Sequence, residues 1–302
     1  FLDNINKKNI KINSTNIDYK TISIILNNKE YQITSFRKDL ISFGRSAFVD
    51  FTHTLYEDAK RRDFTINALY LDEKGNLIDP FDGYKDIINK KLRFIGDPVS
   101  RIEEDYLRIL RFCRFYGTLH IIDIEKNLKE KIIKKAKKIS ILSNMRIRNE
   151  LHKILMVTNF ELCLSMLVTL ELDKYILKKI NKSNKINKHA GFKTKDFKIV
   201  NYIKTYGLNI INSEKLDLIS TIMPHLYNLE NFDLIIKRFE LNKRKIKFLN
   251  FIKQLKNNQL KVNQNIMKQF TSKEIELYIL KLIWKYRCKI NKVNKGFFMT
   301  DR

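Results

Sequence analysis

The sequence is poor in the residues that make turns and in long apolar runs. Its 302 residues contain only eight glycines and three prolines, well below the usual shares of about 7% and 5%. An all-β sandwich or barrel needs closely spaced turns, so most of this chain is expected to be helical. No apolar run reaches the roughly 18 residues that a membrane-spanning helix needs. We therefore expect no membrane partner.

Cysteine and histidine are too few and too scattered to form a metal site. The cysteines are Cys113, Cys163 and Cys288, and their wide spacing without a Cys-x-x-Cys pair predicts reduced, buried thiols. The five histidines are isolated from one another. Residues 1–8 include neither an initiator methionine nor an apolar signal region. These features predict a cytoplasmic protein whose chain is incomplete at its N-terminus.

Acidic residues are scarce compared with basic ones, with 33 Asp and Glu against 59 Lys and Arg and a net charge of +26. AT-rich codons account for part of this, since Lys, Ile and Asn dominate the composition. Residues 1–120 carry 20 basic and 17 acidic side chains, which leaves 39 and 16, a net charge of +23, for residues 121–302. Codon drift would add basic residues to both parts of the chain, so the excess in residues 121–302 favours a nucleic-acid partner for that part. Lysine-rich segments at 129–138 and 242–247 are either a solvated helix face or a face toward RNA.

The pattern of apolar residues predicts an α+β chain with its strands at the beginning. Two β-rich runs within residues 20–37 predict a hairpin, residues 9–12 are a candidate edge strand, and residues 66–78 repeat the hairpin pattern. The first 80 residues are therefore expected to form a small sheet. From residue 83 onward the apolar spacing changes to three and four, which predicts helices to the end of the chain.

The densest cluster of polar residues is EDAKRRDFTINAL at residues 57–69. Adjacent Arg61 and Arg62 offer forked donors suited to phosphate oxygens. Asp63 as an acceptor and Asn67 as an amide could bind a ribose hydroxyl. The cluster predicts a nucleotide site, and the alternative is a surface charge patch.

A second cluster, RIEEDYLRILRFCRF, occupies residues 101–115. Asp105, Arg108 and Arg111 are spaced by three, which predicts that they share one face of a helix. A carboxylate and a guanidinium one turn apart present acceptors and donors that can pair with the Watson–Crick edges of cytosine and adenine. The alternative is an ordinary salt bridge between residues three apart.

Together, the blocks RRDFTINALYLDEKGNLIDPFDGYKDI and KLRFIGDPVSRIEEDYLRILRFCRF resemble the class II tRNA nucleotidyltransferases and bacterial poly(A) polymerases over residues 20–155. The resemblance implies a nucleotidyltransferase head, related to polymerase β and truncated, at residues 1–80. It implies a helical neck with the base-selecting helix at 81–155 and a basic, helical, RNA-binding body and tail at 156–302.

The resemblance also implies roles for individual residues. The ribose and triphosphate would be bound by Arg61, Arg62, Asp63 and Asn67. Asp105 and Arg108, with Glu104 beside them and Arg111 one turn on, would select C or A. The joint between head and neck would be formed by Asp79, Pro80, Asp82 and Gly83. A flexible loop would contain Gly44, Arg45, Val49, Asp50 and Phe51. A neck motif would contain Ser143, Arg146, Ile147 and Glu150, although Met145 stands where the family usually has an acidic residue.

The catalytic block of the family, a Gly-Gly turn followed by Asp-x-Asp, is missing from this sequence. At the position of the third catalytic carboxylate the chain has the neutral Gln32. Asp39 is odd in strand parity relative to Gln32 and is expected to face away. The Mg²⁺ that the family would use with the nucleotide therefore has no expected ligands here, because two-metal phosphoryl transfer needs such carboxylates.

The activity that the resemblance implies is addition of C and A to tRNA 3′ ends from CTP and ATP without a nucleic-acid template. The sequence Glu-Asp-Tyr-Leu-Arg at residues 104–108 favours this activity over poly(A) synthesis, whose branch tends toward Asp-Pro-Val-Arg. Two other interpretations stay open. One is an inactive RNA-binding remnant, and the other is a split enzyme with a complementing N-terminal polypeptide.

Overall fold

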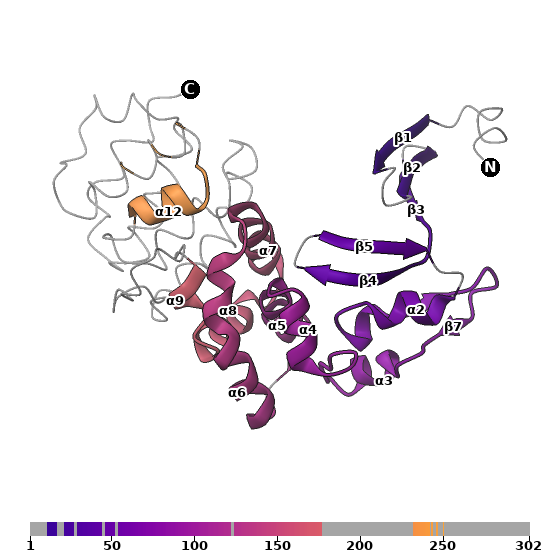
Figure 1. The fold of residues 1–302 in the computed structure, drawn as a ribbon. Helices are drawn as coiled ribbons and strands as arrows, with labels where there is room; N and C mark the ends of the chain where they lie inside the picture. Colours follow the sequence, from indigo (N-terminus) through magenta and orange to yellow (C-terminus); the bar gives the residue numbers. More distant parts are fainter. Residues whose placement is uncertain are drawn as a thin grey trace, which may run out of the picture. The chain divides into compact units, whose positions relative to one another are not determined.

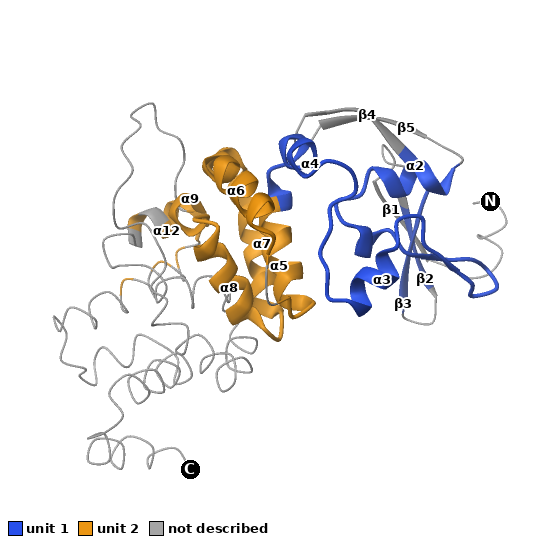
Figure 2. Cartoon of the chain, turned by 90° about the horizontal axis from the view of Figure 1, so that it is seen from below, with its two compact units in different colours: residues 1–108 blue, residues 109–302 orange. Residues whose placement is uncertain are grey.

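The computed structural model describes residues 11–16, 21–26, 29–43, 46–51, 54–121, 124–176 and 232–241, and single helical positions at 243, 246 and 250. The chain divides into two compact units, Phe1–Arg108 and Ile109–Arg302, shown in blue and orange in Figure 2. Each unit is considered by itself. The three domains expected at 1–80, 81–155 and 156–302 stay a prediction. Cys288, Gly44 and Arg45 lie outside the described residues.

The described strands of the first unit form three small antiparallel sheets instead of the one expected. The largest has the order β1 (Lys11–Asn16), β2 (Thr21–Leu26) and β3 (Lys29–Thr34) (Figure 1). The other sheets are the pair β4 (Arg37–Phe43) and β5 (Ser46–Phe51) and the pair β6 (Tyr70–Leu71) and β7 (Leu77–Ile78). The register of β2 and β3 runs from Thr21 opposite Thr34 to Leu26 opposite Lys29. This confirms the hairpin expected within residues 20–37.

The β4–β5 pair corrects two expectations. The segment that resembled a flexible loop contains β5, which pairs with β4 from Arg37 opposite Phe51 to Phe43 opposite Ser46. The sequence of β5, SAFVDF, includes valine and phenylalanine, which favour a strand when a neighbouring strand can pair with it. Asp39 lies in β4, whereas Gln32 lies in β3, which ends at Thr34. Strand parity between the two residues therefore does not apply, because they belong to different sheets.

The described helices of the first unit are short and begin where local chemistry favours a start. They are α2 (Leu55–Lys60), the 3₁₀ turn η3 (Thr65–Asn67), α3 (Gly83–Ile88) and α4 (Pro98–Glu104). In α4, proline occupies the first turn, and the carboxylate of Asp97 accepts the backbone N–H of Ser100 at 2.8 Å. The strand pattern expected from residue 66 onward is interrupted, since Ile66 lies in η3.

The segment between β7 and α3 is held closely against η3. Asp79 accepts the backbone N–H groups of Gly83 and Tyr84 at 2.8 and 2.9 Å. A Cβ at Gly83 would lie 2.2 Å from the carbonyl oxygen of Thr65, so glycine is required there by close approach. Asp86 accepts the Thr65 hydroxyl at 2.6 Å. These contacts fix the RRDFTIN segment against α3.

The core of the first unit lies directly beneath the same segment. Phe64 and Phe94 pair across an isolated bridge, with ring centroids 4.7 Å apart. Ala59, Ala68 and Ile95 form a buried cluster nearby. The arginines of the RRDFTIN segment therefore project from a backbone that is anchored on both sides by apolar packing.

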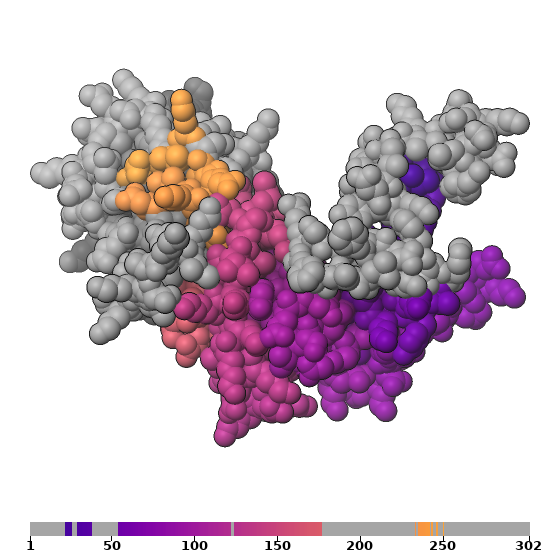
Figure 3. Space-filling view, in the orientation of Figure 1, coloured from indigo at the N-terminus to yellow at the C-terminus, as the bar shows by residue number. Residues whose placement is uncertain are grey.

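The described part of the second unit is helical, as expected. Its elements are α5 (Leu107–Thr118), which begins just before the unit boundary, α6 (Lys126–Lys135), η4 (Ala136–Ile141), α7 (Asn144–Met156), α8 (Phe160–Thr169), α9 (Asp173–Ile176) and α12 (Phe232–Arg238). The helices from α6 to α9, magenta to salmon in Figure 3, make a closely packed body. None of the described helices is long and apolar enough to cross a membrane.

Buried polar groups lie between the helices of the second unit. Glu150 on α7 is almost fully buried and accepts Nε of Arg114 on α5 at 2.6 Å. Cys113 and Cys163 are buried and are not joined in a disulfide, which confirms the expectation for these two thiols. Burial raises the pKa of the Cys113 thiol well above its ordinary value, so the thiol is protonated and unreactive at neutral pH.

Candidate nucleotide-binding site

Arg61 and Arg62, the two arginines expected to bind phosphate, share one buried carboxylate. Asp58 on α2 accepts Nε and Nη2 of Arg61 at 3.0 and 2.5 Å and Nη2 of Arg62 at 3.2 Å. The Asp58 side chain is 4% exposed, and those of Arg61 and Arg62 are 19% and 36% exposed. Arg61 is the C-cap of α2 and Arg62 follows it, so the spacings of three and four residues bring both side chains back to Asp58 at the end of the helix.

Further contacts fix the orientation of each guanidinium. Nε of Arg61 also donates to the carbonyl oxygen of Arg37 at 3.0 Å. Nη1 of Arg62 donates to the carbonyl oxygen of Asn67 at 2.6 Å, and the Arg62 guanidinium carbon lies 4.7 Å from the ring centroid of Tyr70. The pair is thus a preorganised group of donors.

The Asp58 carboxylate is charged at neutral pH in spite of its burial. Burial alone would raise its pKa, but the hydrogen bond and charge of Arg61 and the hydrogen bonds of Tyr70 and Arg62 outweigh this effect. The pKa of Asp58 lies below its ordinary value of 3.8 as a result. Tyr70 donates its hydroxyl to Asp58 at 2.9 Å, and burial together with this hydrogen bond raises the pKa of Tyr70 to about 12.

Sequence reasoning assigned no role to Asp58, although it lies inside the cluster at residues 57–69. Its spacing to the two arginines was the available signal. The structure also brings together Asp63 and Asn67, because Asp63 Oδ1 accepts Nδ2 of Asn67 at 2.9 Å. The roles of these side chains at a ribose stay predictions.

Asp105, Arg108 and Arg111 were expected to share one face of a helix, and the structure shows that they do not. Asp105 has an extended backbone, with φ of −153° and ψ of 105°, and separates α4 from α5. Its carboxylate accepts the backbone N–H of Leu107 at 3.1 Å, and its carbonyl oxygen accepts that of Arg108 at 3.0 Å. Asp105 therefore supports the start of α5 in place of continuing α4.

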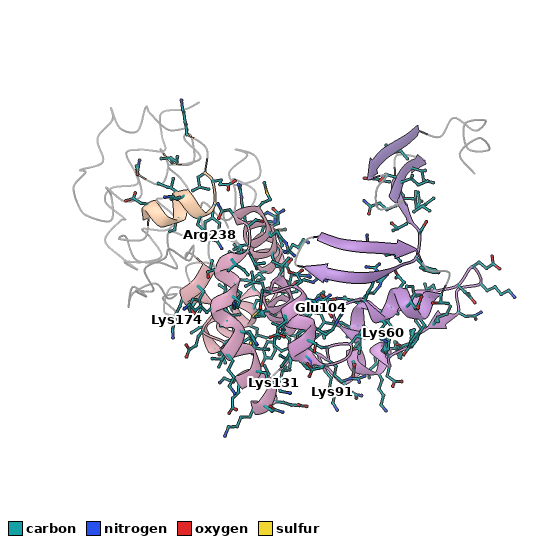
Figure 4. All side chains as sticks on the ribbon, in the orientation of Figure 1. Lys60, Lys91, Glu104, Lys131, Lys174 and Arg238 are labelled. Atoms are coloured by element: carbon teal, nitrogen blue, oxygen red, sulfur yellow. The ribbon has the colours of Figure 1, made fainter. Side chains whose placement is uncertain are left out.

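Arg108 pairs with Glu104, the last residue of α4, which is labelled in Figure 4. Nη1 of Arg108 donates to Glu104 Oε2 at 2.6 Å and to the carbonyl oxygen of Arg101 at 2.7 Å. Glu104 also accepts Nη1 of Arg101. In this second cluster, as in the first, two guanidinium groups share one carboxylate.

Arg101 connects the two clusters and was not singled out by sequence reasoning. Its Nη2 donates to the carbonyl oxygen of Arg61 and, at 2.5 Å, to that of Arg62. Nη2 of Arg108 lies 3.4 Å from the carbonyl oxygen of Arg61. No local pattern in the sequence could have indicated a contact between residues 40 positions apart.

Gln32 and Arg111 lie in other surroundings. Gln32 is exposed on β3, opposite Ser23 of β2. Arg111 belongs to the second unit, where its guanidinium carbon is 5.7 Å from the ring centroid of Phe115. The part of the chain that the structure describes contains no group of three or more His, Cys, Asp or Glu side chains that could hold a metal ion. The described residues therefore offer no set of ligands that fits the Mg²⁺ expected from the resemblance.

Known structures share this fold. A CCA-adding enzyme of Bacillus stearothermophilus solved with CTP matches with a TM-score of 0.69 and 20% identity, over 95% of this chain and 67% of that one. A tRNA nucleotidyltransferase solved with a primer tRNA and an incoming ATP analog matches with a TM-score of 0.65 and 19% identity, over 98% of this chain and 86% of that one. The chain therefore has the same fold as these two structures.

The sequence comparisons match parts of the chain to known proteins. Residues 2–93 match the poly A polymerase head domain, and residues 122–183 match the probable RNA and SrmB-binding site of polymerase A. The human mitochondrial CCA tRNA nucleotidyltransferase 1 is 39% identical over 61% of this chain and 44% of its own length. A CCA-adding enzyme of Streptococcus gordonii is 41% identical over 51% of this chain and 39% of its own length.

Over these matched residues the chain is similar to poly A polymerase domains and to CCA-adding enzymes. It spans less than half the length of the two curated relatives.

Proposed function

We propose that the chain binds nucleotides and RNA for a tRNA nucleotidyltransferase activity, the addition of C and A to tRNA 3′ ends from CTP and ATP. The observation that carries the proposal is the connection of Arg61–Arg62 to residues 101–108 within one unit. It unites a candidate phosphate site and a candidate base-reading segment. The named relatives and the Glu-Asp-Tyr-Leu-Arg segment favour CCA addition over poly(A) synthesis.

The phosphate side of the proposed site is Arg61 and Arg62. One carboxylate, Asp58, serves both guanidinium groups, which leaves an excess of one positive charge. Each guanidinium has five N–H donors, and the contacts described above use only some of them. The remaining donors suit the oxygens of a triphosphate. We assign the ribose contact to Asp63 and Asn67.

The base side is Asp105 and Arg108. The extended backbone at Asp105 places a carboxylate between two helices, and Glu104 holds the Arg108 guanidinium. Carboxylate and guanidinium can together satisfy the edge of cytosine or adenine. A wrong base would leave a donor or an acceptor unpaired, which costs about 1–3 kcal/mol per group.

The RNA side is the basic surface of the second unit. Helix α6 and the following η4 bury Ile132 and Ile139 and expose lysines along the other face: Lys126, Lys134, Lys137 and Lys138. This segment lies within the residues that match the RNA-binding model. The lysine face is assigned to tRNA phosphates in preference to a purely solvated face.

Turnover needs carboxylates that the described residues do not supply, and Gln32 is neutral. We propose that the 302-residue chain alone adds nucleotides at a negligible rate and that a complementing N-terminal polypeptide would provide the Mg²⁺ ligands. The second candidate function is RNA binding without turnover. Gln32 at the position of a catalytic carboxylate favours it. Mixing the chain with a family-type N-terminal segment and measuring incorporation separates the two.

The binding of CTP, ATP, UTP and GTP to the chain, measured by calorimetry, tests the proposed site. We expect CTP and ATP to bind more tightly than UTP and GTP. Asp105→Ala should reduce this preference about tenfold, the effect of one unpaired group of about 1.4 kcal/mol. Arg62→Ala should weaken all four nucleotides alike.

Lys60→Ala is the matched control, because Lys60 is an exposed cation next to the arginine pair (Figure 4). It should change none of the four affinities by more than a small factor. Equal binding of all four nucleotides by the unmodified chain, or an intact preference in Asp105→Ala, contradicts the assignment.

A further inference from the structure

Arg101 links two parts of the first unit that are far apart in the sequence. Its side chain is 12% exposed. One terminal nitrogen, Nη2, donates to the backbone carbonyl oxygens of both Arg61 and Arg62, while Nη1 donates to Glu104. A single guanidinium therefore holds the backbone of the candidate phosphate site and a side chain of the base-reading segment.

Arg108 closes this connection from the other side. It donates to the carbonyl oxygen of Arg101 and to Glu104 through Nη1, and Nη2 lies within 3.4 Å of the carbonyl oxygen of Arg61. The result is a closed hydrogen-bond network of two guanidinium groups, one carboxylate and three backbone carbonyls. In such a network a displacement of one member changes the geometry of the others.

We propose that Arg101 is a positioning residue that couples base recognition by residues 104–108 to phosphate binding by Arg61 and Arg62. This inference rests on the proposed function. A base that fits Asp105 and Arg108 fixes the network, and the network fixes the backbone from which the two phosphate-binding side chains project. Affinity for the triphosphate then depends on the fit of the base.

The chemistry of the contact requires arginine. The fork spans a carboxylate on one side and two carbonyl oxygens on the other. A lysine at position 101 keeps the positive charge but concentrates its donors at one point and cannot span these acceptors. Arg101→Lys therefore separates the geometry of the contact from its charge.

A double-mutant cycle measured by CTP binding tests the coupling. Dissociation constants are determined for the unmodified chain, Arg62→Ala, Asp105→Ala and the double variant, and the four measurements are repeated in the Arg101→Lys background. In the first cycle the dissociation constant of the double variant should differ by about three- to tenfold from the value obtained by multiplying the two single effects, as expected for members of one network. In the Arg101→Lys cycle the effects should multiply.

Arg93→Lys is the matched control. The Arg93 guanidinium also joins a carboxylate to a backbone carbonyl, since it donates to Asp86 at 2.8 Å and to the carbonyl oxygen of Phe81 at 3.0 Å. Neither of these two hydrogen bonds involves the backbone of Arg61 or Arg62. Arg93→Lys should leave the first cycle unchanged. The coupling is overturned if the effects of Arg62→Ala and Asp105→Ala on the dissociation constant simply multiply in the first cycle. It is also overturned if the deviation persists in the Arg101→Lys background. Failure of the unmodified chain to bind CTP instead overturns the proposed function on which it rests.

Hydrogen exchange on the unmodified chain provides a test that does not depend on the folding of any variant. Tripolyphosphate has no base, so it can occupy only the phosphate side. Its binding should slow amide exchange within residues 101–108 as well as near Arg61 and Arg62. Binding that slows exchange near the arginine pair and leaves residues 101–108 unchanged overturns the proposal.

Discussion

At the scale of single residues, Asp58 determines whether the arginine pair is ordered. An arginine pair on an exposed loop would lose side-chain entropy on binding phosphate. Here Asp58, Tyr70 and the Asn67 carbonyl oxygen already hold the guanidinium groups. Removing the carboxylate would leave two partly buried cations without their shared acceptor, which destabilises a fold strongly.

The contact between Tyr70 and Asp58 predicts a dependence of stability on pH at both ends of the scale. The pKa of Asp58 is lowered in the folded chain, so its contribution is present above about pH 4 and is lost as the pH falls further. The pKa of Tyr70 is raised to about 12 from 10.0, so its contribution is complete below pH 10 and is lost as the pH rises toward 12.

Tyr70→Phe should therefore lower the free energy of unfolding by about 2 kcal/mol at pH 8, the worth of a hydrogen bond to a charged group. The difference from the unmodified chain should shrink between pH 10 and 12. Urea unfolding at a series of pH values measures both effects. Tyr84→Phe, at a tyrosine that is 55% exposed, should match the unmodified chain throughout. A constant difference across this range would show that the Tyr70 hydroxyl does not donate to Asp58.

Residue types and spacing predicted the location of Arg61, Arg62, Asp63 and Asn67 in one polar cluster. They did not indicate how the donors are already engaged. The shared carboxylate was within one helical turn and could have been found. The Arg101 contact to two backbone carbonyls depends on the tertiary fold, so no sequence pattern carries it.

At the scale of secondary-structure elements, the interruption between α4 and α5 is the largest difference from the expected arrangement. Residues 101–115 contain neither glycine nor proline, and their apolar spacing is that of one helix. The helix nevertheless ends at Glu104. Beyond it the Asp105 carboxylate accepts the backbone N–H of Leu107, and the Arg108 side chain donates to the carbonyl oxygen of Arg101, in place of helical backbone hydrogen bonds. Tertiary interactions here outweigh local helix propensity.

The close approach of α3 to η3 predicts the effect of a substitution at Gly83. Gly83→Ala would place a Cβ 2.2 Å from the Thr65 carbonyl oxygen, a backbone atom that cannot move aside alone. We expect a loss of about 1–3 kcal/mol in the free energy of unfolding, as for other overpacked sites. Nucleotide affinity should weaken with it, because η3 carries Asn67.

Gly75→Asn is the control for this prediction. Gly75 has a positive φ of 82°, and a Cβ there would meet no atom within 4 Å. Asparagine tolerates the left-handed region better than other side chains with a Cβ, so this variant should lose much less stability than Gly83→Ala. Equal losses in chemical denaturation would show that the α3–η3 approach is not what requires Gly83.

At the scale of the whole molecule, charge and chemistry are divided along the sequence. Residues 1–120 are almost balanced, with 20 basic and 17 acidic side chains, whereas residues 121–302 carry 39 and 16. The first part holds paired arginines that suit a compact polyanion such as a triphosphate. The second part spreads single lysines along a helix, as suits an extended backbone of phosphates.

This division predicts how RNA binding responds to salt. Each RNA phosphate neutralised by the chain contributes about −0.7 to −0.9 to the slope of log affinity against log salt concentration. A tRNA lacking its 3′ end should therefore bind with a steep negative slope. Replacing Lys134 and Lys138 by alanine should make the slope less negative by up to about 1.8, since two phosphate contacts are removed. Filter binding over a range of salt concentrations measures the slope.

Lys90→Ala with Lys91→Ala is the matched control, because both lysines of the first unit are exposed and their removal makes the same change in net charge. Lys91 is labelled in Figure 4. If RNA is bound by the lysine face of α6 and η4, the control pair leaves the slope nearly unchanged. If the two pairs change the slope equally, net charge alone attracts the RNA, and the assignment to the α6–η4 face is wrong. An affinity that does not change with salt would contradict phosphate binding by the chain altogether, since counterion release accompanies any such contact.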